Sequence, residues 1–416
     1  MSHDDAERNG TFVTGSQLRS LFEELNPFAR DLSLKPPEQR KTVLAANANY
    51  PLEIEVPAFF HAAAMQGGSP LIVQISGAGL ETLGKALKPK SKSSADLVGD
   101  LRLGARLMAR VCEVYASIYR PPFVAIGLDH FAVPGMREAL FADDDPQDSK
   151  VPCPPGEQVK KDLFDALDAC EACGVEPPPE EDLGAYEAYL CSQQYRRCIA
   201  SFMAVIEEMN PAWAMIDTGE MPPGLNFAIT KEVCRLVKES GSDAIVEAEY
   251  GATGQAGAED TYEPLKDRDL ALFARQVAGF VQYTGASGIS YPIGMEHAAP
   301  SGVRHKPDVV RLETVQREII KAAGRYVPFA QHGGTGAQEV ARGLVAKNNV
   351  NTYFLVKAAQ SVAMHVSKYR EGIAQGRKTA SGTAMYLSAS VAVLDATVEK
   401  LQECGTFGAA ESIVRR

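Results

Sequence analysis

The segment FVAIGLDH, residues 123–130, is a short apolar run that ends in two polar residues. Seven further short runs are mostly apolar, and longer amphipathic stretches separate them. The predicted strands are 43–48, 71–76, 123–130, 212–218, 243–251, 287–294, 326–333 and 348–355. The predicted helices include 96–119, 224–240, 265–283, 308–323 and 336–346. Eight strands, each followed by a helix, predict a closed α/β (β/α)8 TIM barrel, with an open doubly wound sheet as the alternative.

The length of the chain exceeds what one barrel needs. The chain has 416 residues, whereas a barrel uses roughly 250. The barrel core is expected at about 43–357, and most of the surplus lies within 131–211, after the third strand. We expect this segment to be a helical insertion that covers the barrel mouth or forms an interface. Helical extensions are expected before residue 40 and over about 358–416, so the chain is one elaborated barrel domain.

Composition and charge exclude several classes of function. The formal net charge of −11 opposes broad electrostatic binding to nucleic acid or to anionic lipid. No run approaches the 18 apolar residues of a membrane-spanning helix. The polar, acidic start of the chain is unlike a signal peptide. Eight scattered cysteines then indicate reduced thiols in the cytoplasm.

Three of the seven histidines occupy the same kind of position. His130 ends the third predicted strand, His297 follows the sixth and His332 ends the seventh. The carboxyl ends of barrel strands meet at one mouth, where active sites lie, and three imidazoles there are typical of a catalytic Zn²⁺ site with an open position. The alternative is three separately satisfied histidines. His61 and His365 lie in helical patterns, which indicates packing or surface roles.

Acidic residues end the same strands. Asp129 precedes His130, and both side chains can reach the mouth if the strand end is frayed. Glu247 and Glu249 alternate on the fifth strand and therefore share a face. The next loop, 251–260, holds three glycines and ends in an acidic pair, Glu259 and Asp260, which favours either a mobile flap that delivers a carboxylate or a solvated acidic loop.

Two polar segments predict an anion site. GGTG at 333–336 lies between the seventh strand and its predicted helix, where free amides and the helix dipole favour phosphate, although a plain turn would have the same glycines. NNVNT at 348–352 follows on the eighth strand. Barrels often bind phosphate with the loops after strands seven and eight.

These segments together resemble the class II, metal-dependent fructose-bisphosphate and tagatose-bisphosphate aldolases. The similar motifs are QISGAG (74–79), LDH (128–130), MIDT (215–218), EAEYG (247–251), GAED (257–260), HGGTG (332–336) and NVNT (349–352). They occur in the family's order across about 43–357. No lysine ends a predicted strand at the mouth, which agrees with metal chemistry rather than a Schiff base.

The resemblance implies roles for individual residues. It places one Zn²⁺ per chain, or another divalent metal, on His130, His297 and His332, with Glu249 as a supporting or alternative ligand. Asp129 would transfer a proton at the aldehyde-derived oxygen, and Glu259 would remove the proton that forms the enediolate. The residues implied in contacts with dihydroxyacetone phosphate are Ser76, Gly333, Thr335, Asn349, Asn351 and Thr352.

The implied activity is reversible cleavage of a ketose (bis)phosphate, similar to fructose 1,6-bisphosphate, in cytoplasmic carbohydrate metabolism such as glycolysis. The products would be dihydroxyacetone phosphate and an aldehyde, and the enzyme would be a homo-oligomer. The sequence departs from the family at Ala298, where the family has glycine, and at Asn351, where it often has aspartate. No basic residue for the far phosphate is found. A ketose whose far end is a hydroxyl or a sulfonate is therefore the alternative substrate.

Two other functions compete with the aldolase hypothesis. A metal-dependent hydrolase on the same barrel would need a metal-bound water and a nearby base, and the flap carboxylate and phosphate loop argue against it. A barrel without activity, serving as an assembly subunit, is opposed by the presence of all three histidines together with Asp129 and Glu259.

Four cysteines in the insertion have a spacing loosely like a structural zinc site. They are Cys170, Cys173, Cys191 and Cys198. Both pairs fall within amphipathic helical patterns, in which cysteine is an ordinary small hydrophobic residue. The helical pattern favours packing roles for them.

Overall fold

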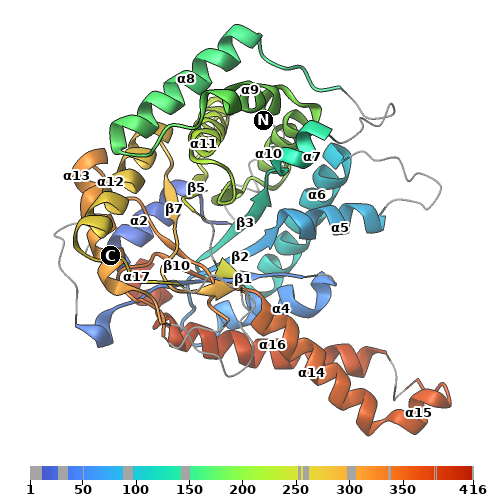
Figure 1. The fold of residues 1–416 in the computed structure, drawn as a ribbon. Coiled ribbons are helices and arrows are strands. Elements are labelled where there is room, and N and C mark those ends of the chain that lie inside the picture. Colours follow the sequence, from blue (N-terminus) through green and yellow to red (C-terminus); the bar gives the residue numbers. More distant parts are fainter. Residues whose placement is uncertain are drawn as a thin grey trace.

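Eight parallel strands form the centre of the computed structural model (Figure 1). The structure describes residues 12–26, 36–49, 51–87, 97–141, 150–251, 254–255, 262–297, 306–335, 339–378, 380 and 382–414. The strands are β1 (Val43–Asn47), β2 (Leu71–Ser76), β3 (Val124–Ala132), β4 (Trp213–Asp217), β5 (Ile245–Glu249), β7 (Gly288–Ser290), β9 (Ala330–Gln331) and β10 (Lys347–Val350). Their order is β7-β5-β4-β3-β2-β1-β10-β9. A parallel bridge between Ile289 and Phe329 joins the two ends, so the predicted barrel is confirmed.

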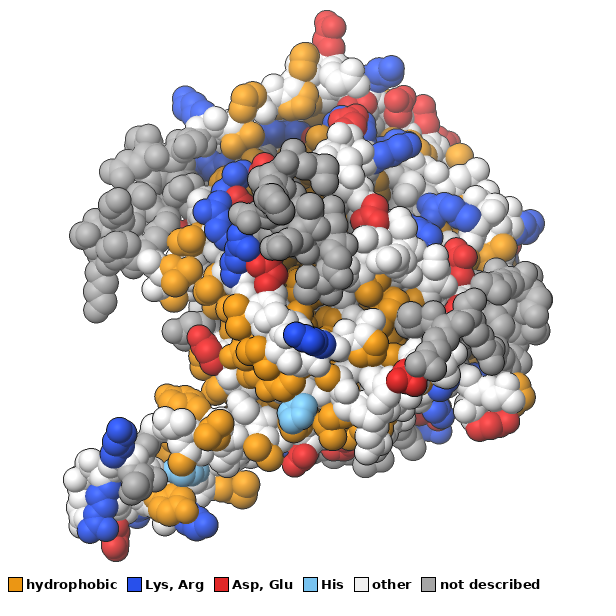
Figure 2. Space-filling view, turned by 180° about the vertical axis from the view of Figure 1, so that it is seen from behind, with side chains coloured by type: hydrophobic (Ala, Val, Ile, Leu, Met, Phe, Trp, Pro, Cys, Tyr) orange, Lys and Arg blue, Asp and Glu red, His pale blue; other side chains and the backbone are white. Residues whose placement is uncertain are grey.

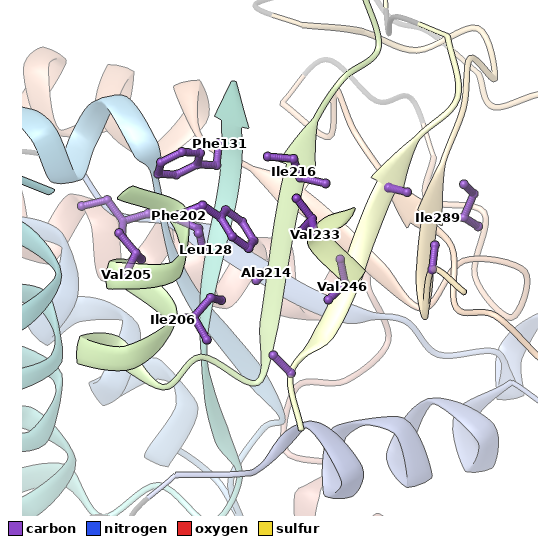
Figure 3. Close-up of a cluster of buried hydrophobic side chains, with 14 of the residues drawn as sticks. Leu128, Phe131, Phe202, Val205, Ile206, Ala214, Ile216, Val233, Val246 and Ile289 are labelled. Atoms are coloured by element: carbon purple, nitrogen blue, oxygen red, sulfur yellow. The ribbon is translucent and has the colours of Figure 1, made fainter. Parts of the chain in front are cut away.

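Helices surround this barrel. They are α4 (Leu52–Ala64), α5 (Gly77–Leu87), α6 (Leu97–Tyr119), α10 (Gln193–Met209), α11 (Pro223–Glu239), α12 (Asp267–Thr284), α13 (Val309–Ala323) and α14 (Thr352–Lys368). Outward-facing strand residues are apolar, and they pack on these helices. Figure 3 shows one such contact, in which Phe202 of α10 lies against Phe131 and Leu128 of β3.

Inward-facing residues change from apolar to polar along the barrel axis. At the amino ends of the strands Val43, Ile72 and Ile245 surround Trp213. An N-terminal helix, α2 (Gly15–Leu25), closes this end, with Phe22 packed edge-on against Trp213 at 5.7 Å. At the carboxyl ends the inward positions are polar, namely Asn47, Gln74, Asp129, Asp217, Glu247, Glu249 and Asn349. The apolar end stabilises the barrel, and the polar end forms the mouth.

The segment after β9 differs from the prediction. Residues 339–346 form turns and a bridge between Arg342 and Val345 instead of the predicted helix over 336–346. Gly343 has φ of +83°, a conformation that a helix does not contain. The eighth strand ends at Val350 rather than at 355, because α14 begins at Thr352. Burial of Leu344 and Val345 in the core has overridden the helical periodicity.

The segment after β3 is helical, as predicted, and its helices occupy different layers of the molecule. It contains α7 (Met136–Phe141), α8 (Gly156–Cys173), a 3-10 turn (Glu180–Asp182), α9 (Leu183–Cys191) and α10. Helix α10 occupies the place of the third barrel helix. Helix α8 packs on the outside of α11 and α12, where Gly224 and Gly279 allow Leu167 and Cys173 to approach closely (Figure 1). The long helix of the insertion therefore lies on the barrel wall, not over its mouth.

The four cysteines of the insertion lie on α8, α9 and α10. Three are buried and Cys191 is half-buried. Among the described residues, no side-chain cluster suited to a metal includes a cysteine. They serve as packing residues in these helices.

The C-terminal extension is helical, as expected. Helices α15 (Arg370–Ala374) and α16 (Thr383–Glu403) follow α14, and α16 returns along α14 and α4 before α17 (Ala410–Val414). Together α14, α15 and α16 form an arm that projects from the barrel, at the lower right of Figure 1. No helix among the described residues has the length and apolar character needed to cross a membrane.

Candidate active site at the barrel mouth

A β-bulge in β3 brings Asp129 and His130 to the mouth together. Between β3 and β4 the register shifts after Leu128, so β3 holds one residue more than its partner before Phe131. His130 has φ of +35°, in the left-handed region. Adjacent strand residues normally point to opposite faces of the sheet, and a bulge redirects one of them. The bulge here therefore lets both Asp129 and His130 face the mouth. The sequence suggested a frayed strand end, whereas the structure shows a bulge within a continuous strand.

His130 and His332 face each other across the mouth. Nε2 of His130 lies 3.0 Å from Nδ1 of His332. The other nitrogen of each ring contacts a carboxylate: Nδ1 of His130 lies 2.9 Å from Asp217, and Nε2 of His332 lies 2.8 Å from Glu247. An ionised carboxylate can accept a hydrogen bond but cannot donate one, so the ring nitrogen that contacts it must carry a proton. The two nitrogens that face each other therefore either share one further proton or both present lone pairs to a cation.

This arrangement fits a divalent metal. Two imidazole nitrogens on one tetrahedral ion lie about 3.3 Å apart, close to the separation of the facing nitrogens. Histidines that bind metals donate their second N–H to a carboxylate, as both rings do here. Two groups of side chains could each hold an ion: Asp129 with both histidines, and His130 with Asp217 and Glu249.

Asp129 is buried and held from two sides. Nδ2 of Asn47 donates to one carboxylate oxygen at 2.6 Å, and Nδ2 of Asn349 donates to the other at 2.8 Å. Burial would raise the pKa of Asp129, but the charges of His130, Lys347 and His332 outweigh it and hold the pKa below its usual value. Asp129 is therefore an anion placed beside the histidine pair.

Charge also determines the protonation of His130 and Asp217. Burial would lower the pKa of His130, but the charge of Asp129 and the hydrogen bond to Asp217 raise it to about 10. Burial would raise the pKa of Asp217, but hydrogen bonds with His130 and Glu249 lower it instead. In the protein without metal, His130 is a cation enclosed by carboxylates.

A buried network lies directly beneath the histidines. Glu247 accepts hydrogen bonds from His332, from the indole of Trp213 and from Nζ of Lys347, the last at 3.0 Å. Nζ of Lys347 also lies 3.9 Å from Asp129 and 4.5 Å from the centre of the Trp213 ring. Burial would raise the pKa of Glu247, but the charges and hydrogen bonds of Lys347 and His332 outweigh it and hold the pKa below its usual value. The network fixes the ring of His332 with Nδ1 toward the mouth.

The predicted phosphate residues lie at the ends of β9 and β10. The amide of Gly334 donates to the carbonyl of Asn349, and Oγ1 of Thr335 accepts from the amide of Tyr353 at 3.3 Å. The loop after β9 therefore touches the N-terminus of α14, at Thr352. The described residues between this loop and β10 form no helix, so α14 supplies the helix N-terminus that the sequence predicted at 336.

Three other predicted site residues lie outside the histidine pair and the loop after β9. Asn351 accepts a hydrogen bond from Nδ2 of Asn49 at 2.9 Å. Ser76 pairs with Asp129 in the β2–β3 register, and its Oγ accepts the amide of Gly79. His297 lies in a short strand, β8 (Glu296–His297), that pairs with β6 (Gly254–Gln255) of the predicted flap.

Two further expectations fall outside what the structure describes. The position of the His297 side chain and the whole of Glu259 lie outside the described residues. The structure thus brings His130, His332, Glu249 and Asp129 together, and it leaves the roles of His297 and Glu259 as predictions.

Four residues of the site were missed by sequence reasoning. They are Asn47, Asp217, Glu247 in its contact with His332, and Lys347. Each is a polar residue at an inward position of a buried strand. Polar side chains at alternate positions of an otherwise apolar strand are the signal that would have identified them.

The chain is similar to known proteins over most of its length. The family model described as fructose-bisphosphate aldolase class-II matches residues 196–409, from α10 to the region of α17. No curated protein matches the chain. The fructose-bisphosphate aldolase of Campylobacter jejuni has a similar structure, with a TM-score of 0.57, 15% identity and coverage of 95% of this chain and 96% of that one.

A second solved structure is the YdjI aldolase of Escherichia coli K12. It is 16% identical and has a TM-score of 0.47, with coverage of 89% of this chain and 93% of that one. The similarity to the Campylobacter jejuni enzyme, at 15% identity, shows a shared fold alone, whereas the family model matches more than half of the chain. The chain is therefore an aldolase, a carbon–carbon lyase, and belongs to the class II fructose-bisphosphate aldolase family.

Proposed function

We propose that the protein is a zinc-dependent aldolase that cleaves a ketose phosphate reversibly into dihydroxyacetone phosphate and an aldehyde. The observation that carries this proposal is the pair of facing nitrogens on His130 and His332, with Asp129 beside them. The pair has the chemistry of an ion site, and Asp129 supplies a carboxylate within reach of it.

Each site residue would have a distinct role in this reaction. His130 and His332, together with His297, would hold the ion, and Glu249 would support them. A bound divalent ion would polarise the substrate ketone and so acidify the neighbouring C–H. Asp129, kept anionic, would accept the hydroxyl proton during cleavage and return it during condensation. Glu259 would exchange the proton on the donor carbon.

The loop after β9 and the start of α14 would bind the phosphate of the donor. Gly333 and Thr335 belong to the loop that meets Thr352 at the N-terminus of a 17-residue helix, whose dipole favours an anion. Oδ1 of Asn349 is buried and has no hydrogen-bond partner among the described residues. A substrate hydroxyl would satisfy it. Asn351 and Ser76 would contact the substrate at the edges of the site.

Cleavage assays under metal control test this function. We expect dihydroxyacetone phosphate to be released from a ketose phosphate, to stop after chelation and to resume on addition of Zn²⁺. His332→Ala should lose the metal, whereas His61→Ala, an exposed residue stacked on Tyr119, should keep it. Glu259→Gln should stop exchange of the α-proton of dihydroxyacetone phosphate without changing metal content. Cleavage that resists chelation would contradict the proposal, and uptake of water into the products would favour a hydrolase.

We also propose that the protein acts in the cytoplasm and self-associates through the arm. All eight cysteines are free thiols, which agrees with a reducing compartment. The arm exposes large apolar side chains on α14 and α16, which Figure 2 shows at its lower left. They are Leu355, Val356, Met364, Val366, Tyr386, Leu387 and Val391. A second copy of the chain is the proposed occupant, since class II aldolases of this kind are expected to be homo-oligomers.

A further inference from the structure

A cavity opens beside His130, between the barrel and the helices that follow β2 and β3. Its volume is about 530 Å³. The end of β3 and the residues that follow it form its floor, α5 and α6 form one side, and α7 and α10 form the other. His130 borders this cavity and also contacts His332, so the cavity adjoins the histidine pair.

The walls of this cavity are held in place. Two arginines of α6 form ion pairs with α10: Arg102 with Glu207 at 3.0 Å, and Arg106 with Glu208 at 2.7 Å. Helix α10 is tied on its other side by Arg196, whose Nη1 lies 2.7 Å from Glu232 of α11. The cavity is therefore a preformed feature of the fold, of the kind that binds small molecules.

The lining is mainly apolar. Leu97 and Leu101 of α6 face the apolar residues that follow the bulge of β3, from Phe131 to Pro134. Walls of this kind gain binding energy from apolar surface that leaves water. A short, fully hydroxylated chain would leave much of this surface without contact.

The charges of the lining do not favour a second phosphate. Its basic residues are Lys85, Arg197 and His130, and its acidic residues are Glu81, Asp100 and Glu138, so the opposite charges balance. Lys85 already forms an ion pair with Glu81. A lining without an excess of positive charge gives a phosphate dianion no net electrostatic attraction.

We propose that this cavity binds the aldehyde-derived half of the ketose, and that this half is uncharged and larger than a three-carbon phosphate. The inference rests on the proposed aldolase function and narrows its substrate class. The donor half keeps its phosphate at the start of α14, and the acceptor half carries an apolar or partly apolar chain toward α6.

Condensation assays with dihydroxyacetone phosphate test this inference. The acceptors are glyceraldehyde 3-phosphate and a series of unbranched neutral aldehydes from three to eight carbons. We expect kcat/KM to rise about threefold to fourfold for each added methylene until the cavity is filled. The best neutral aldehyde should exceed glyceraldehyde 3-phosphate by at least tenfold.

A charge variant on the cavity wall gives an independent readout. Leu97→Arg should raise kcat/KM for glyceraldehyde 3-phosphate and lower it for the long neutral aldehydes. Val114 is exposed on the same helix and lies away from the cavity. Val114→Arg should therefore change neither kcat/KM value. If Leu97→Arg leaves both values unchanged, the cavity is not the acceptor site and the inference is wrong.

Proton exchange separates this inference from the function on which it rests. If dihydroxyacetone phosphate exchanges its α-proton but glyceraldehyde 3-phosphate remains the best acceptor, the inference about the cavity fails and the aldolase proposal stands. If no exchange occurs with Zn²⁺ present, the proposed function itself fails.

Discussion

At the scale of single residues, Lys347 balances the buried charges of the barrel mouth. It is fully buried and lies between Glu247 and Asp129. Removal of one partner from a buried ion network leaves an uncompensated charge, which costs about 3–5 kcal/mol. We expect Lys347→Met to lower the free energy of unfolding by this amount, as measured by urea denaturation.

The matched control for Lys347 is an exposed ion pair. Lys85→Met removes the same charge from the pair with Glu81, where the lysine is mostly exposed, and should cost less than about 1 kcal/mol. The double variant Lys347→Met with Glu247→Gln should lose less stability than the sum of the two single variants. Strict additivity would show that the two residues are not coupled.

Glu55 is a buried carboxylate whose titration should affect stability. It lies on α4 and accepts hydrogen bonds from the amide and side chain of Asn49. Burial raises the pKa of Glu55 to about 7, although those hydrogen bonds lower it. The folded protein thus binds this proton more tightly than the unfolded chain does. The resulting stability is fully present below pH 4.5 and is lost as the pH rises to about 7.

The variant Glu55→Gln isolates this contribution because glutamine does not titrate. Relative to the wild type, it should gain up to about 3 kcal/mol of stability between pH 4.5 and pH 8. Urea denaturation at both pH values measures this difference. Glu53→Gln removes a carboxylate from an exposed position of the same helix and serves as control. A difference between Glu55→Gln and wild type that is equal at both pH values would contradict the prediction.

At the scale of elements, α5 and α6 cross at a contact that only glycine allows. A Cβ atom on Gly104 of α6 would lie 1.9 Å from the carbonyl oxygen of Leu80 in α5. We expect Gly104→Ala to push the helices apart and lower the free energy of unfolding by about 1–3 kcal/mol. Gly184→Ala, in α9 with open space around it, should be neutral or stabilising. Thermal unfolding of both variants measures the contrast.

Elements also show what the sequence could and could not predict. The strands β1 to β5 were predicted because each is a short apolar run bounded by polar residues. The strand-end rule correctly placed His130 near His332. The contact of Lys347 with Glu247 was not predictable, since it depends on barrel closure, which sets β10 across from β5. The helix expected at 336–346 failed because burial of Leu344 and Val345 outweighed local periodicity.

At the scale of the whole molecule, the arm exposes several large apolar side chains. Isolated apolar residues are normal on a surface, but a gathering of them on one projecting element indicates an interface. Met364 of α14 is 68% exposed and Leu387 of α16 is 61% exposed. A soluble monomer would leave these surfaces in water on an element that extends away from the barrel (Figure 2).

Substitution on the arm should therefore shift the oligomeric state. Burial of a leucine side chain contributes about 1.5–3 kcal/mol, and each 1.4 kcal/mol corresponds to about tenfold in a dissociation constant. We expect Leu387→Glu to weaken self-association at least tenfold in sedimentation velocity over a range of protein concentrations. Ile118→Glu, at an equally exposed position on α6, should leave it unchanged. A wild-type protein that sediments as a monomer at every concentration would show that the arm serves another purpose.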